Sequence, residues 1–197
     1  MGNHDAVILA AGGSQRLGRP KQLLTVKGET LLARAVRLVA ATRPGQTVAI
    51  VGAYAERMCS QLSGAIAVFN PDWAEGMASS LHAAADALAG RTDPILVVLV
   101  DQLALDEDHL QRLLSAHDGS ADTVTGYGDA MGVPAVLRAT TLARATLLRG
   151  DTGFRALWQE AVPQVIRADA FADDLDTEAD VIRAIAAGRL DPERGRM

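Results

Sequence analysis

Apolar residues in this chain gather in short uniform runs, separated by stretches in which apolar positions recur with helical spacing. The run at 6–11 (AVILAA) has no polar position, which is typical of a strand buried on both faces of a parallel sheet. Similar runs predict strands at 46–53, 65–70 and 94–101. Helical spacing predicts helices at 30–42, at 79–90 with Gly90 closing it, and after an Asp106 cap through Leu114.

The second half continues the same alternation. It predicts strands at 122–128, 134–139 and 164–168, and helices at 140–150, 152–162 and 177–188. Such alternation is typical of a three-layer α/β domain with a mainly parallel sheet. No repeat or linker divides the chain, so we expect one domain at 1–190 and a loose tail at 191–197. The strand order is not predicted.

The loop after the first strand concentrates glycines and basic residues. Gly12, Gly13 and Gly18 cost backbone entropy, and Arg16 and Lys21 bring positive charge. The loop is neither a Walker A motif, because Arg19 follows Gly18, nor a dinucleotide fingerprint. Close-approaching N–H groups and two cations suit a phosphate chain. The alternative is a tight turn with solvated basic residues.

The charge and the cysteine count exclude several classes of binding partner and site. The formal net charge is −5, from 19 Lys and Arg against 24 Asp and Glu, which argues against nucleic acid. Cys59 is the only cysteine, so neither an internal disulfide nor a cysteine-based zinc site can form. The run at 6–11 is too short for a membrane span, so we expect a cytoplasmic protein without a membrane partner.

The segment LAAGGSQRLGRPKQL (9–23) resembles the signature LAAGxSxRxGxxK of the nucleotidyltransferases that include the molybdenum-cofactor cytidylyl- and guanylyltransferases. The resemblance implies a Rossmann-like, GT-A-like fold. It also implies nucleotide binding by Ala10, Ala11, Gly12, Gly13 and Ser14, and phosphate binding by Arg16 and Lys21.

The segment NPDWAEGMASSL (70–81) predicts a turn followed by a serine-capped helix, which would place Ser79 and Ser80 at a helix N-terminus. An ordinary helix cap is the alternative reading. The segment resembles the cytidylyl branch of the family, where it borders the nucleotide base. By that resemblance Asn70, Gly76, Ser79 and Ser80 bind the nucleotide, and CTP is favoured over GTP.

Two acidic segments are candidate metal ligands. Asp101 ends a buried strand, a common place for a Mg²⁺ ligand, with a turn-capping role as the alternative. In DDLDTEAD (173–180), Thr177 and Asp180 fit a capping box, which leaves Asp174 and Asp176 unexplained. The family pattern supplies a metal-facing acid here, and we expect Asp176, with Asp174 behind it. Leu103 replaces a family proline without removing a ligand.

Two further segments resemble the acceptor side of the family, GVPAVL (132–137) and LLRGDTGFRALW (147–158). The resemblance, which spans 6–185, places Gly132, Pro134, Asp151 and Arg155 near the acceptor. A tight loop before a helix is the alternative for the second segment.

By the same resemblance, the reaction is Mg²⁺-dependent attack of molybdopterin phosphate on CTP with release of pyrophosphate. Lys21, Arg16 and Asp101 are then the catalytic residues, and a xanthine dehydrogenase-type molybdoenzyme receives the product. The alternatives are GTP as donor, another phosphorylated acceptor, or a molybdenum-cofactor carrier or chaperone without turnover.

Overall fold

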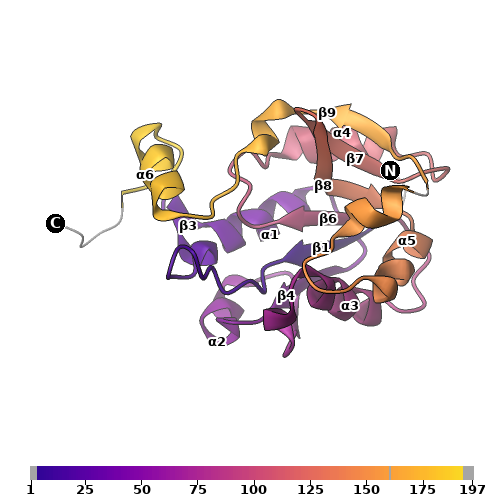
Figure 1. Ribbon diagram of the computed structural model, residues 1–197, viewed down its shortest axis with the longest axis horizontal. Helices are drawn as coiled ribbons and strands as arrows, with labels where there is room; N and C mark the ends of the chain where they lie inside the picture. Colours follow the sequence, from indigo (N-terminus) through magenta and orange to yellow (C-terminus); the bar gives the residue numbers. More distant parts are fainter. Residues whose placement is uncertain (1–3, 160, 193–197) are drawn as a thin grey trace.

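A seven-stranded sheet with the order β5-β4-β1-β6-β8-β7-β9 forms the centre of the computed structural model, which describes residues 4–159 and 161–192 (Figure 1). The strands are β1 Asp5–Leu9, β4 Thr47–Val51, β5 Ile66–Phe69, β6 Ile95–Leu99, β7 Thr123–Tyr127, β8 Ala130–Leu137 and β9 Gln164–Arg167. All neighbours pair in parallel except β8, which is antiparallel to both β6 and β7. The predicted mainly parallel sheet is confirmed.

Helices cover both faces of this sheet. The α-helices are α1 Leu31–Ala41, α2 Ala55–Met58, α3 Met77–Ala87, α4 Glu107–Ala116, α5 Ala139–Ala143 and α6 Glu178–Ala186. Short 3₁₀ turns are η1 Lys21–Leu23, η2 Cys59–Gln61, η3 Trp73–Glu75, η4 Arg144–Leu147, η5 Phe154–Gln159 and η6 Asp169–Ala172, and a small hairpin joins β2 Thr25–Val26 to β3 Glu29–Thr30. No helix in the described part of the chain has the length and hydrophobicity of a membrane span.

The alternation of side chains along β1 explains why its positions after Asp5 are all apolar. Ala6 and Ile8 pack with α1 and α4 on one face, and Val7 and Leu9 pack with α3 and α5 on the other. Both faces are buried, so a polar side chain on this strand needs a partner, and Asp5 has one in Arg91. This arrangement gives the predicted three layers.

Three predicted helices differ in the structure. The helix expected at 140–150 is only the short α5, Ala139–Ala143, continued by the 3₁₀ turn η4. The helix expected at 79–90 begins at Met77 and ends at Ala87; its N-cap is Gly76, so the serine cap was wrong. Ser79 instead lies inside the first turn, where its hydroxyl donates to the Gly76 carbonyl. The helix expected at 152–162 is the 3₁₀ segment η5, and residue 160 lies outside the described residues.

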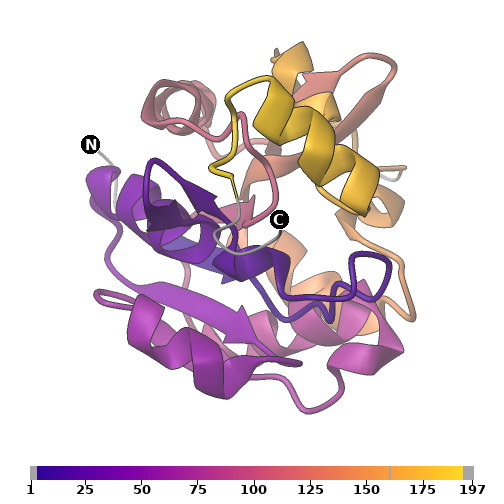
Figure 2. The same ribbon diagram turned by 90° about the vertical axis from the view of Figure 1, so that its left-hand side faces the viewer.

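The C-terminal segment returns to the carboxyl end of β6. Asp174 pairs with Gln102 in an isolated antiparallel bridge, and the Thr177–Asp180 capping box then starts α6, as predicted. Figure 2 shows α6 from this end, and Leu17, in the loop after β1, belongs to one apolar cluster with Val181 of α6. Asp191, in the predicted tail, accepts hydrogen bonds from the Lys27 and Gly28 N–H groups, whereas 193–197 lie outside the described residues.

Asp122 is a buried carboxylate that ties the start of β7 to the α5–η5 region, and its removal tests this junction. It accepts hydrogen bonds from Arg138 N and Thr141 Oγ1, each at 2.9 Å, and from Trp158 Nε1 at 2.9 Å. Asp122→Ala leaves these donors without a partner and is expected to lower the free energy of unfolding by about 3 kcal/mol. Chemical denaturation measures the change. The exposed Asp118→Ala is the control, and equal stability of the two variants contradicts the role of Asp122.

Candidate active site

Hydrogen bonds from the Gln22 side chain and the Lys21 backbone fix the loop that follows β1. Gln22 is buried, and its Nε2 donates to the carbonyls of Ala10 and Gly12, each at 2.8 Å. Ser14 adopts φ of 49°, and its hydroxyl accepts from the Lys21 N–H at 3.2 Å. These contacts close the loop on itself and bring the Lys21 side chain to the end of β1.

Lys21 lies between two carboxylates that come from distant parts of the chain. Its Nζ is 2.5 Å from Asp101 Oδ2 and 3.2 Å from Asp176 Oδ1. Arg16 contacts the other oxygen of Asp176 at 2.7 Å. Burial alone lowers the pKa of Lys21, but Asp101 and then Asp176 raise it by more, so the pKa of Lys21 lies above its ordinary value. The ammonium is therefore charged at neutral pH.

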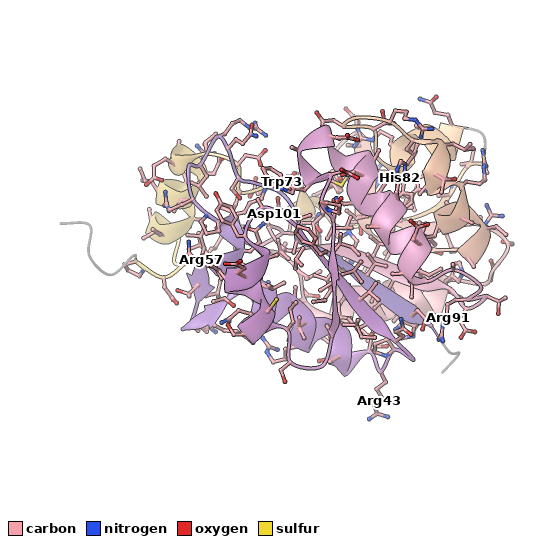
Figure 3. The ribbon with its side chains drawn as sticks, turned by 90° about the horizontal axis from the view of Figure 1, so that it is seen from below. Arg43, Arg57, Trp73, His82, Arg91 and Asp101 are labelled. Carbon is pink, nitrogen blue, oxygen red and sulfur yellow. The ribbon has the colours of Figure 1, made fainter. Side chains whose placement is uncertain are left out.

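A cavity of about 410 Å³ opens over this ion cluster at the carboxyl ends of β1 and β6. Figure 3 shows two of its lining residues, Trp73 and Asp101, away from Arg91, which pairs with Asp5 at the start of β1. The predicted site residues that line it are Ala10, Ala11, Gly12, Arg16, Lys21, Gly76, Ser80, Asp101, Asp151 and Asp176. The fold thus brings predicted site residues from five separate segments of the chain to one cavity.

Four residues predicted to bind nucleotide do not line this cavity. Gly13 and Ser14 belong to the loop behind it, and Asn70 and Ser79 are buried. The Asn70 amide Nδ2 donates to the hydroxyls of Ser79 and Ser80, at 2.9 and 3.2 Å, and its Oδ1 accepts from Asp72 N. In this structure Asn70 therefore fixes the connection from β5 to α3.

The carboxylates fit a hard divalent cation. Asp101 Oδ1 is buried and, within residues 4–159 and 161–192, has no hydrogen-bond partner. The same part of the chain holds no ready-made group of three or more His, Cys, Asp or Glu side chains for a metal. Mg²⁺ does not require one, because it commonly takes one or two carboxylates and completes its shell with water and substrate phosphates. Asp101 and Asp176 offer that minimal set.

A second cavity of about 320 Å³ adjoins the first and shares Leu9, Met77, Leu99 and Asp151 with it. Its remaining walls are mostly apolar and aromatic, with Tyr127, Phe154 and Trp158 among them. Of the predicted acceptor residues, Gly132, Asp151 and Arg155 line it. Pro134 does not, because it is buried below, where its carbonyl accepts from the Thr125 hydroxyl.

The sequence did not indicate two residues of the first cavity, Gln22 and Trp73. Gln22 stands in the quoted motif beside Lys21, and Trp73 stands in NPDWAEG, so both were in segments already singled out. The burial of a polar residue such as Gln22, which is only 1% exposed, could not be predicted from the sequence.

Asp174 gives the cluster a pH dependence that can be measured. Partial burial, and then repulsion from Asp101 and Asp176, raises the pKa of Asp174 to about 6. Because this value exceeds the ordinary 3.8, the folded state holds the proton more tightly, and stability falls as pH rises between the two values. Asp174→Asn, measured by thermal unfolding in a chelator, should therefore raise Tm at about pH 7 and lose this advantage below about pH 4.

The control for this change is Asp129→Asn, which alters an exposed carboxylate on the turn between β7 and β8. It should leave Tm unchanged at both pH values. A lower Tm for Asp174→Asn at neutral pH contradicts the repulsion that the geometry implies.

Comparison with known proteins agrees with this geometry. "Nicotine blue oxidoreductase" of Paenarthrobacter nicotinovorans is 33% identical over 195 residues, covering 91% of this chain and 95% of that protein. "Bifunctional protein GlmU" of Bifidobacterium longum subsp. infantis is 31% identical over 141 residues, which is 62% of this chain but only 31% of GlmU. The crystal structure of Rv0371c from Mycobacterium tuberculosis superposes with a TM-score of 0.83 at 27% identity, over 94% of this chain and 98% of that one.

The family model for the MobA-like NTP transferase domain matches residues 6–165. This range contains the glycine-rich loop, Asp101 and both cavities' walls except for the acids of the C-terminal segment. A complex of Rv0371c with manganese, at a TM-score of 0.79 and 25% identity, points to a divalent metal in the related structure. The chain belongs to the MobA-like NTP transferase family and is a nucleotidyltransferase.

Proposed function

We propose that the protein is a CTP:molybdopterin cytidylyltransferase, which makes the cytosine dinucleotide form of the molybdenum cofactor and releases pyrophosphate. The ion cluster of Lys21, Arg16, Asp101 and Asp176 carries the proposal, because it combines phosphate-binding cations with metal-binding carboxylates in one cavity. The adjoining apolar cavity offers room for a second substrate. In this proposal residues 1–190 act as one nucleotidyltransferase domain.

The proposed reaction joins a terminal phosphate oxygen of the acceptor to the α-phosphorus of CTP, while the bond from that phosphorus to pyrophosphate breaks. Both reactants are anions, so the reaction needs charge neutralisation and alignment more than a general base. Lys21 and Arg16 would exchange their carboxylate partners for phosphate oxygens and stabilise the negative charge of the leaving pyrophosphate. No covalent intermediate is required.

Asp101 and Asp176 are the residues that would hold Mg²⁺, with Asp174 beside them. A divalent cation bound there supplies positive charge against the phosphate oxygens. The buried Oδ1 of Asp101, which accepts no hydrogen bond from the residues that the structure describes, supports this role, since a buried carboxylate oxygen without a donor is costly unless a ligand occupies it.

For the acceptor, we propose the second cavity. Its aromatic and aliphatic walls suit a planar heterocycle such as that of molybdopterin, and Arg155 could meet the acceptor phosphate. The Arg155 guanidinium donates to the Met131 carbonyl, at 3.0 and 3.2 Å. Asp151 lines both cavities and therefore stands where the two substrates would meet. The product would pass to a molybdoenzyme of the xanthine dehydrogenase type.

The choice of CTP rests on the resemblance of NPDWAEGMASSL to the cytidylyl branch. GTP, or another phosphorylated acceptor, would use the same cluster. The name of the Paenarthrobacter relative adds an oxidoreductase to the candidate classes of function. A carrier without turnover is disfavoured, because carrying a cofactor does not require Lys21 between two carboxylates at a phosphate-binding loop.

Pyrophosphate release decides between these alternatives. We expect release with Mg²⁺, molybdopterin and CTP, and much slower release with GTP, ATP or UTP. Release with GTP alone keeps the chemistry and contradicts the base assignment. Absence of release with all four nucleotides, from folded protein, contradicts the proposed acceptor and favours another acceptor, a carrier or redox chemistry.

Substitution of the cluster tests the roles of its members. Lys21→Met and Asp101→Asn should each lower turnover by about 100-fold or more, because both remove charge that is needed most in the transition state. Lys27→Met is the matched control, since Lys27 is exposed and, among the described residues, its hydrogen bond to Asp191 comes from the backbone N–H. Circular dichroism verifies the fold of each variant. Near-normal turnover in either cluster variant contradicts the proposed site.

A further inference from the structure

Trp73 borders the first cavity, yet neither of the roles assigned above uses it. It begins the 3₁₀ turn η3 between β5 and α3, and it lines the cavity together with Ala10, Ala11 and Gly12. Figure 3 shows it above Asp101 at the same end of the sheet. An aromatic residue between the loop that meets the phosphates and the start of α3 is well placed to contact whatever is attached to those phosphates.

Two glycines make room for the Trp73 side chain. A Cβ atom at Gly13 would lie 2.6 Å from Cζ3 of the indole, and one at Gly52 would lie 2.7 Å from the Cβ of Trp73. Neither glycine has a positive φ, so backbone conformation does not require glycine at these positions. The requirement is space. At Gly13 the tryptophan fills it, and at Gly52 the tryptophan shares it with the Ala11 carbonyl oxygen, which would also lie 2.7 Å from the added Cβ.

The turn that carries Trp73 is fixed at both ends. Asn70 holds Asp72 N through its Oδ1, and it holds the hydroxyls of Ser79 and Ser80 through its Nδ2. In contrast, no hydrogen bond found among the described residues uses the indole N–H of Trp73, whereas that of Trp158 donates to Asp122. Trp73 is therefore positioned by packing and by its hydrogen-bonded turn, and the residue is half-buried and lines the cavity.

We propose that the Trp73 indole is the platform on which the base of the nucleoside triphosphate stacks. This inference rests on the proposed nucleotidyl transfer and names the residue that recognises the part of the donor which the cations do not contact. The ring borders the same cavity as the phosphate-binding Lys21, and stacking requires only a flat apolar surface there. Stacking is the same before and during the reaction, so it contributes to binding rather than to turnover.

The experiment compares binding of CTP with binding of tripolyphosphate, which has the phosphates but no base. Calorimetry in Mg²⁺ should show that Trp73→Leu weakens CTP binding by about tenfold or more, while Trp73→Phe retains most of the affinity. Affinity for tripolyphosphate should stay within about twofold in both variants, because the cations are unchanged. In turnover assays Trp73→Leu should raise KM for CTP and leave kcat nearly constant.

Phe69→Leu is the matched control, because Phe69 is an aromatic residue at the end of β5, just before the same connection, but is 61% exposed at the sheet edge. It should change neither affinity. Unchanged CTP binding in Trp73→Leu overturns the platform. Equal loss of CTP and tripolyphosphate also overturns it, because Trp73 would then only shape the loop at Gly13.

Gly13→Ala is a second, independent way to disturb the Trp73 ring, because the added Cβ would displace the indole. Gly13→Ala alone should weaken CTP binding. In the double variant with Trp73→Leu, the fold-loss of CTP affinity should be smaller than the product of the two single fold-losses. A fold-loss equal to that product contradicts the platform.

If wild-type protein binds GTP instead of CTP, the base assignment fails, but the same comparison, made with GTP, decides the role of Trp73. If wild-type protein binds none of the four nucleotides, the proposed function and the platform both fail.

Discussion

The ammonium group of Lys21 is mostly buried, and a buried charge is stable only where opposite charges compensate for its lost hydration. Its partners are Asp101, 80 residues away, and Asp176, 155 residues away. The N-terminal loop, the end of β6 and the C-terminal segment must therefore meet at one point. The cavity exists because these three segments converge without filling the space above them.

The direction of the strands explains why a second cavity lies next to the first. In a parallel sheet the carboxyl ends of β1 and β6 share one edge, and the loops that follow them form one site. β8 runs the opposite way, so its first residues, near Gly132, lie beside the end of β6 rather than at the far edge. One reversed strand thus brings a loop from the second half of the chain to the same site.

Much of this could be read from the sequence, because the relevant signals are local. The apolar runs indicated the strands β1, β4 and β6, which are buried, whereas the similar run at 65–70 forms the exposed edge strand β5. The Asp106 and Thr177 caps were confirmed because a capping side chain contacts only its own helix. The strand order was not predictable, since β8 inserts between β6 and β7 through contacts that no periodicity records.

The site was predicted less completely than the fold, again for a physical reason. Lys21 and Asp101 belong to recognisable segments, whereas the burial of Gln22 and the contact of Trp73 with Gly13 depend on tertiary packing. The predicted serine cap was wrong because Gly76, packed against Gly150 and Asp151, can begin α3 two residues earlier than the serines.

The chain contains two tryptophans, and each borders a different cavity: Trp73 the first and Trp158 the second. Their surroundings differ, since Trp158 is buried and hydrogen-bonded to a carboxylate, whereas Trp73 is partly exposed. The intrinsic fluorescence of the protein therefore combines one signal from each cavity. Occupancy of the two cavities can be followed separately and in time, without an added label, and with it the order in which two substrates arrive.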